Sequence, residues 1–137
     1  MSLFVDTSVW YAAADADEHD NRAAQEILSR GERLITTDHI LLETWFLLRS
    51  RLGKPAAETF WEALSSGVAH LETVTGADLA VARGIGDAFP DQDFSIVDRT
   101  SFAVMQRLGL WRAASFDNDF AIYRFGPGRK LAFEVVR

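Results

Sequence analysis

The chain of 137 residues contains no cysteine. This absence excludes disulfide bonds, thiolate zinc sites and cysteine nucleophiles. No apolar run approaches the roughly 20 residues that a membrane-spanning helix needs. Aspartates interrupt or bound the short apolar runs near the amino terminus, and no Lys or Arg precedes them, so a signal peptide is not indicated. We therefore expect a cytoplasmic protein without membrane association.

The overall composition is that of a globular protein, with 48% apolar and 25% charged residues. Its length predicts one domain over residues 1–137. The formal net charge of −6 argues against a protein that binds nucleic acid by bulk electrostatics alone. It does not exclude an enzyme acting on phosphodiesters, because carboxylates that hold divalent cations are neutralised when those cations bind.

Short apolar runs predict strands, and amphipathic stretches between capping residues predict helices. The predicted strands are Leu3–Val5, Arg33–Thr36, Ala69–Val74, Trp111–Phe116 and Leu131–Val136. Helices are predicted to end at Ala14, to cover about residues 18–28, and to span Asp38–Leu52, Pro55–Ser66, Thr75–Ala88 and Ser95–Leu108. This alternation predicts an α/β fold, with a mostly parallel central sheet flanked by helices.

Two aspartates directly follow predicted strands, Asp6 after the first and Asp117 after the fourth. Ligands of such α/β folds bind in the crevice beyond the carboxyl ends of the strands. We therefore expect both carboxylates to lie at the functional edge of the sheet.

A third acid, Glu43, lies on the helical stripe that also carries Ile40 and Leu47. A carboxylate on an apolar stripe loses hydration, so it needs a partner or a changed pKa. An ion pair with Arg49 or Arg51 is the structural alternative to a functional role.

A fourth acid, Asp98, falls between Phe102 and Met105 on the helix that Ser95 is expected to cap. An acid three residues after a cap can complete a capping box or complement the helix dipole, which is the structural alternative here. Four acids from separate elements would repel one another if they were packed together without counterions. Divalent cations relieve that repulsion, and two ions roughly 4 Å apart can activate water and stabilise a leaving oxygen.

Four segments resemble the motifs of PIN-domain nucleases, in the order that the family has them. They are Phe4–Val9, Ile40–Thr44, Ser95–Ser101 and Ser115–Phe120. The segments span most of the chain, and its length is similar to that of the VapC-type toxins of bacterial toxin–antitoxin pairs. The resemblance implies a single PIN-like domain.

Carried over position by position, the resemblance implies that Asp6, Glu43, Asp98 and Asp117 hold Mg²⁺, with Mn²⁺ as the alternative ion. Ser8 and Ser115 would orient these acids or their waters; the family usually has threonine where this chain has Ser115. Asp119 is a rival to Asp117 as the fourth acid, and the two are expected to point differently. Asp93 lies close enough in sequence to reach the mouth of the site, although a loop or helix-cap role is the simpler interpretation.

The resemblance further implies an endoribonuclease that uses water to attack the phosphodiester, forms a homodimer and is inhibited by a cognate antitoxin. The sequence does not separate this toxin from a PIN nuclease of RNA maturation or DNA processing. A PIN-like binding module without activity is expected to lack some of the acids, and none is missing. A haloacid-dehalogenase-like phosphatase needs a second aspartate two residues after Asp6, where this chain has Ser8.

Tryptophan positions give one more expectation. Trp45, Trp61 and Trp111 lie on apolar-patterned elements and are expected in the core. Trp10 follows Asp6 closely, so it is a candidate either for the core or for stacking on an RNA base at the cleft.

Overall fold

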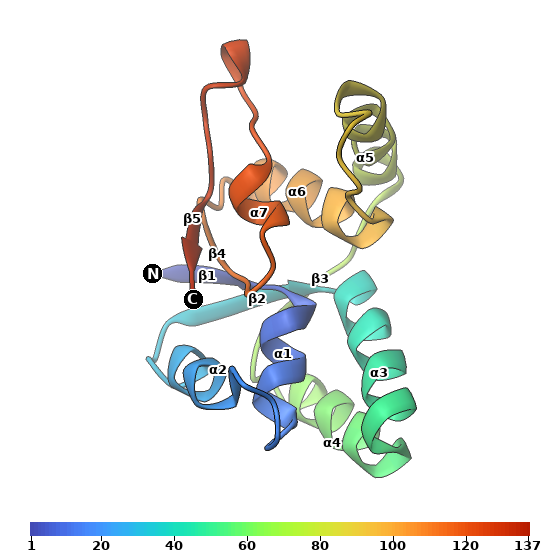
Figure 1. The fold of residues 1–137 in the computed structure, drawn as a ribbon, viewed down its shortest axis with the longest axis vertical. Helices are drawn as coiled ribbons and strands as arrows, with labels where there is room; N and C mark the ends of the chain where they lie inside the picture. The colour runs from blue at the N-terminus through green and yellow to red at the C-terminus, as the bar shows by residue number, and fades with distance from the viewer.

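Five parallel strands form a sheet through the middle of the molecule (Figure 1), in a computed structural model that describes all 137 residues. The strands are β1 (Ser2–Val5), β2 (Arg33–Thr37), β3 (His70–Glu72), β4 (Arg112–Ala114) and β5 (Glu134–Val136). Their order across the sheet is β3-β2-β1-β4-β5, so the first strand of the chain is the central one. Its apolar side chains are fully buried, as expected for a strand covered on both faces.

Helices cover both faces of this sheet (Figure 1). One layer contains α1 (Thr7–Ala14), α2 (Asn21–Leu28), α3 (Asp38–Leu52) and α4 (Lys54–Ser65). The other contains α5 (Gly76–Ala88), α6 (Ile96–Leu108) and α7 (Asp119–Ile122). A short 3₁₀ turn, η1 (Pro127–Arg129), lies at the tip of a projecting loop. The predicted α/β class with a parallel central sheet is confirmed. No helix combines the length and the apolar character that crossing a bilayer requires.

The predicted boundaries differ from the structure mainly at the short elements. The last three strands each have three residues, so the sequence pattern overestimated their length. Leu131, expected in the last strand, instead forms an isolated antiparallel bridge with Phe125. Helix α7 was not predicted, because its four residues are too few to show a helical period.

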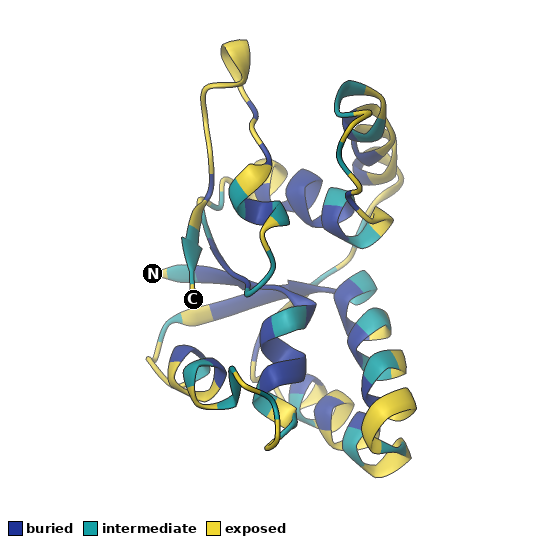
Figure 2. Ribbon diagram, in the orientation of Figure 1, coloured by how far each residue is buried: buried dark blue, intermediate teal, exposed yellow.

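The strands in the middle of the sheet are mostly buried, and the helices are exposed on their outer sides (Figure 2). The tryptophans divide between core and surface. Trp10 is 4% exposed and its Nε1 donates to Thr36 Oγ1 at 3.3 Å, so it is a core residue and does not offer a ring to a ligand. Trp61 and Trp111 are 48% and 54% exposed, so the expectation that they fill the core was wrong. Trp111 directly precedes the short β4 and stacks on Phe125 with 5.7 Å between ring centroids, so it packs against the surface of the core rather than inside it.

Candidate active site

Asp6 lies where β1 ends and α1 begins, and it is only 3% exposed. Its backbone N–H donates to Ala114 O at 3.0 Å, which extends the β1–β4 pairing by one residue. Its Oδ2 atom accepts hydrogen bonds from Ser8 Oγ and Ser115 Oγ, both at 2.9 Å. The end of the central strand thus carries a buried, oriented carboxylate.

The two serines also join the ends of β1 and β4 to each other. Phe116 N donates to Ser8 Oγ at 3.0 Å, and Asp117 N donates to Ser115 Oγ at 3.2 Å. Each hydroxyl therefore accepts from the backbone after β4 while it donates to Asp6. This arrangement places Asp117 beside Asp6, as the carboxyl-edge rule predicts.

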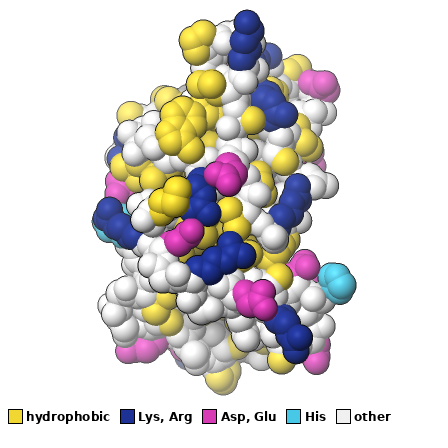
Figure 3. Space-filling view, turned by 90° about the vertical axis from the view of Figure 1, so that its left-hand side faces the viewer, with side chains coloured by type: hydrophobic (Ala, Val, Ile, Leu, Met, Phe, Trp, Pro, Cys, Tyr) yellow, Lys and Arg dark blue, Asp and Glu magenta, His cyan; other side chains and the backbone are white.

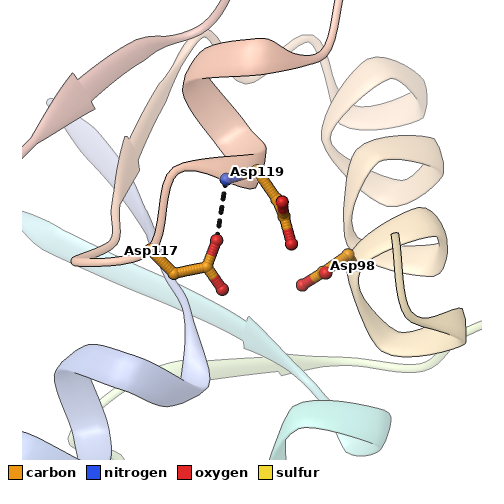
Figure 4. Close-up of side chains that lie close together, drawn as sticks. All are labelled: Asp98, Asp117 and Asp119. Atoms are coloured by element: carbon orange, nitrogen blue, oxygen red, sulfur yellow. Dashed lines mark hydrogen bonds between the residues drawn. The ribbon is translucent and has the colours of Figure 1, made fainter. Parts of the chain in front are cut away.

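Three further carboxylates converge next to this point (Figure 4). Asp98 comes from the first turn of α6, Asp117 from the segment after β4, and Asp119 from the start of α7. One carboxylate oxygen of each lies within 4.8 Å of the others. Asp117 and Asp119 thus approach one another, although sequence reasoning expected them to point differently, because the chain turns into α7 between them.

In Asp98 and Asp117, one carboxylate oxygen accepts a backbone hydrogen bond, and the other oxygen accepts none from the backbone. Asp98 Oδ2 accepts from Ser95 N at 3.2 Å, and Asp98 N donates to Ser95 Oγ at 3.0 Å, which is a complete capping box. Asp117 Oδ1 accepts from Asp119 N at 2.7 Å. The capping role of Asp98 is therefore real, and it orients the side chain toward the other acids rather than excluding a functional role.

Burial and mutual repulsion raise the pKa values of these acids. Burial raises the pKa of Asp98 to about 8, and the neighbouring Asp119 and Asp117 carboxylates contribute to the increase. Burial also raises the pKa of Asp6 to about 6, with a further contribution from the charge of Asp117. The pKa of Asp117 is raised mainly by burial as well. Loss of water and nearby like charges both favour the neutral form of a carboxyl group.

No basic side chain forms an ion pair with this cluster. The five ion pairs of the molecule join other residues, such as Arg112 with Glu32 at 2.9 Å and with Glu134 at 3.4 Å. On the face at the β5 edge, acidic and basic side chains are interspersed rather than separated (Figure 3). Oriented carboxylate oxygens without a counterion are the donor set that Mg²⁺ or Mn²⁺ takes, so the residues fit a divalent cation.

Glu43 is half-buried on α3, and neither an ion pair nor a hydrogen bond of its side chain is present. The alternative of a pair with Arg49 or Arg51 is therefore not realised. One turn earlier, His39 Nδ1 lies 3.3 Å from Thr100 Oγ1 of α6, so Glu43 occupies the face of α3 that turns toward α6. Glu43 is not among the three acids that converge, and Asp93 is exposed in the loop before α6.

One residue near the cluster escaped the sequence analysis. Arg137 follows β5, and its Nη1 donates to Asn118 Oδ1 at 3.1 Å, between the two acids at the start of α7. The charge of Arg137 lowers the pKa of Asp117, although burial outweighs it. The rule that located Asp6 and Asp117, a polar residue directly after a strand, also points to Arg137.

Comparison with known proteins agrees with this architecture. The PIN domain model matches residues 3–126, and the chain belongs to the PIN-domain family.

Among its relatives is the "23S rRNA-specific endonuclease VapC20" of Mycobacterium tuberculosis, 38% identical over 125 residues that cover 90% of this chain and 95% of the relative. The crystal structure of that protein, described as a sarcin–ricin loop cleaving toxin, matches with a TM-score of 0.82 and 35% identity over 87% of this chain and 92% of that one. A Rickettsia felis VapBC2 structure, solved with a DNA fragment from its promoter, shares the fold alone at 8% identity, with a TM-score of 0.65 and coverage of 86% and 89%.

Proposed function

We propose that this protein is a metal-dependent endoribonuclease that hydrolyses phosphodiester bonds of RNA and acts as the toxin of a toxin–antitoxin pair. The observation that carries the proposal is the group of buried and half-buried carboxylates without ion-pair partners, at the carboxyl edge of a parallel sheet in a PIN domain. The 38% identity to an endonuclease specific for 23S rRNA supports RNA as the substrate class, and the description of the matching structure as a sarcin–ricin loop cleaving toxin supports a structured loop.

In this proposal, Asp6, Asp98 and Asp117 hold Mg²⁺ or Mn²⁺, with Glu43 approaching from α3. Bound there, the cation supplies charge neutralisation at the phosphate and lowers the pKa of water for attack on phosphorus. Ser8 and Ser115 keep the Asp6 carboxylate in one orientation through their two hydrogen bonds. Asp119 positions Asp117 through its backbone N–H, and its own carboxylate is close enough to serve as a further ligand.

The family assignment and the exposed apolar side chains support protein partners. Leu42, Phe46 and Trp61 are 56%, 63% and 48% exposed on α3 and α4. Leu42, Phe46 and Trp61 also line one apolar groove together with Leu41 and Trp45. Exposed apolar patches of this kind mark interaction surfaces. We propose a second copy of this chain and a cognate antitoxin as the partners. Light scattering of the purified chain tests the homodimer. Co-expression with the antitoxin tests the second partner, because it should rescue the growth arrest that the chain causes alone.

The nuclease proposal is tested with RNA cleavage by the purified chain, free of any partner, in Mg²⁺, in Mn²⁺ and in EDTA. We expect the wild type to cut an RNA hairpin in either metal and not in EDTA, and D6N to lose activity. D17N, which changes an exposed acid outside the site, is the matched control and should cut like the wild type. Equal cleavage by D6N and the wild type, or cleavage that persists in EDTA, would reject the assigned site.

A further inference from the structure

Arg137 occupies the same edge of the sheet as the acids. Ser115 N donates to Val136 O at 3.2 Å, continuing the register in which Ala114 pairs with Val136. Arg137 therefore follows directly beside Ser115, the residue whose hydroxyl donates to Asp6. The backbone places a cation at the rim of the acidic cluster, next to the strands that provide two of its carboxylates.

The Arg137 side chain is exposed, and its bond to Asn118 engages one nitrogen with a neutral amide oxygen. It forms no ion pair with any carboxylate of the cluster. A guanidinium has five N–H donors in a planar fork, so most of them remain available to an anion. Arg137 is thus anchored at the site without forming an ion pair with its carboxylates.

Other arginines near this end of the molecule are engaged elsewhere. Arg99 Nε donates to Ser95 O at 3.4 Å, and its guanidinium lies against Gly86 of α5, where a Cβ would approach within 2.0 Å of Nη1. Arg124 Nη1 donates to the carbonyl oxygens of residues 121–123 at the end of α7. Arg129 lies over the Phe89 ring at 4.8 Å from its centroid.

From this placement we propose that Arg137 binds a backbone phosphate of the RNA beside the acidic cluster, with Asn118 holding the guanidinium in position. The inference rests on the proposed function, and adds to it a contact made by the protein rather than by a cation. A net charge of −6 leaves RNA binding dependent on a few placed cations, and arginine suits this role because its fork matches phosphate oxygens. Arg137 is a substrate-binding residue in this proposal.

The test compares wild type, R137A, R137K and R30A. Arg30 is exposed in the turn that leads into the amino end of β2, at the opposite edge of the sheet, and is the matched control. Binding of a fluorescently labelled RNA hairpin is followed by anisotropy in EDTA at several salt concentrations, and cleavage kinetics are measured in Mg²⁺. R137A should bind about tenfold more weakly, since a hydrogen bond to a charged group is lost. Its salt dependence should decrease by about one counterion.

R137K should fall between R137A and the wild type, because it keeps the charge and loses the fork. KM should rise in R137A while kcat stays within about threefold, since the acids remain intact. RNA affinity and salt dependence equal to the wild type in R137A would overturn the inference while wild-type cleavage keeps the proposed function. Mn²⁺ affinity about tenfold higher in R137A, with RNA affinity unchanged, would also overturn it, because Arg137 would then be a counterion that competes with the metal. No cleavage by the wild type would reject both proposals.

Discussion

Two capping boxes of the same design lead to opposite electrostatic outcomes. Asp78 is the third residue of α5, and Asp98 is the third residue of α6. Each exchanges hydrogen bonds with the cap residue, Thr75 or Ser95, and the two are 3% and 8% exposed. By local sequence and by burial the two aspartates are nearly equivalent.

Their partners across the fold are different. Arg107 donates to both oxygens of Asp78, at 3.0 and 2.9 Å, and this holds the pKa of Asp78 below its ordinary value. Asp98 has no arginine partner and lies among other carboxylates; burial raises its pKa to about 8, and those carboxylates add to the increase. An S/T-x-x-D pattern therefore predicts a helix start in both places, while the tertiary neighbours decide whether the acid stabilises the fold or belongs to the candidate active site.

The largest effect should come from comparing the activities of D98N and D78N. Asparagine keeps an oxygen for the capping hydrogen bond in both variants and removes the charge. We expect D98N to lose at least about 100-fold in RNA cleavage, because it removes a proposed metal ligand. D78N should stay within about threefold of the wild type, since Asp78 lies outside the site. Similar losses in both variants would mean that folding, and not the site, is responsible.

Metal binding gives the next contrast. At a free Mg²⁺ or Mn²⁺ concentration of 100 times Kd, binding to the native state stabilises a protein by about 2.7 kcal/mol. Thermal unfolding of the wild type and of D78N should shift upward together with added metal. D98N should lose most of this shift, and an undiminished shift in D98N would place the metal elsewhere.

For the unfolding free energy, in contrast to RNA cleavage, D78N should be the more strongly affected of the two variants. D78N loses charge-assisted hydrogen bonds from Arg107 and should be about 1.5 kcal/mol less stable than the wild type. In the absence of divalent cations, D98N should be as stable as the wild type or more so, because it removes a buried carboxyl group whose raised pKa costs stability near neutral pH. Urea unfolding at pH 7.5 in EDTA measures both. Destabilisation of D98N to the level of D78N would show that Asp98 serves the fold in the same way.

The pH dependence of the unfolding free energy should give the smallest effect when it is expressed per pH unit. Asp98 has a pKa of about 8 in the folded chain against an ordinary value of 3.8, so between these values the folded chain binds more protons than the unfolded one. Stability without metal should therefore fall as pH rises from 5 to 8, by at most about 1.4 kcal/mol per pH unit for one group. Asp78 has a lowered pKa, and its contribution is lost only as pH falls below its ordinary 3.8. D98N should flatten the slope, and D78N should keep it.

The contrast between local sequence patterns and tertiary contacts also explains how much of the fold and of the site could be predicted from the sequence. The central strand was predictable because three apolar residues precede Asp6, and α6 was predictable because Ser95 and Gly109 bound an apolar stripe. Both patterns are local. The assignment of Asp6 and Asp117 to one edge used only the rule for parallel strands, and the structure places them side by side.

The rest depends on contacts that no local pattern contains. Helix α7 has four residues, and the turn into it brings Asp119 back toward Asp117. Trp61 and Trp111 are apolar by residue type, yet their exposure depends on what packs beside them. The metal-ligand roles of Asp6, Glu43, Asp98 and Asp117 remain predictions that the variants above address.

The central position of β1 determines how the acidic cluster assembles during folding. The first strand pairs with one that begins more than a hundred residues later, and the Ser115 hydroxyl reaches Asp6 across 109 positions of sequence. The acidic cluster therefore forms only when segments from both ends of residues 1–137 have folded onto one sheet. A fragment that lacks β4 and α7 cannot assemble it, because Asp117 and Asp119 come from that part of the chain.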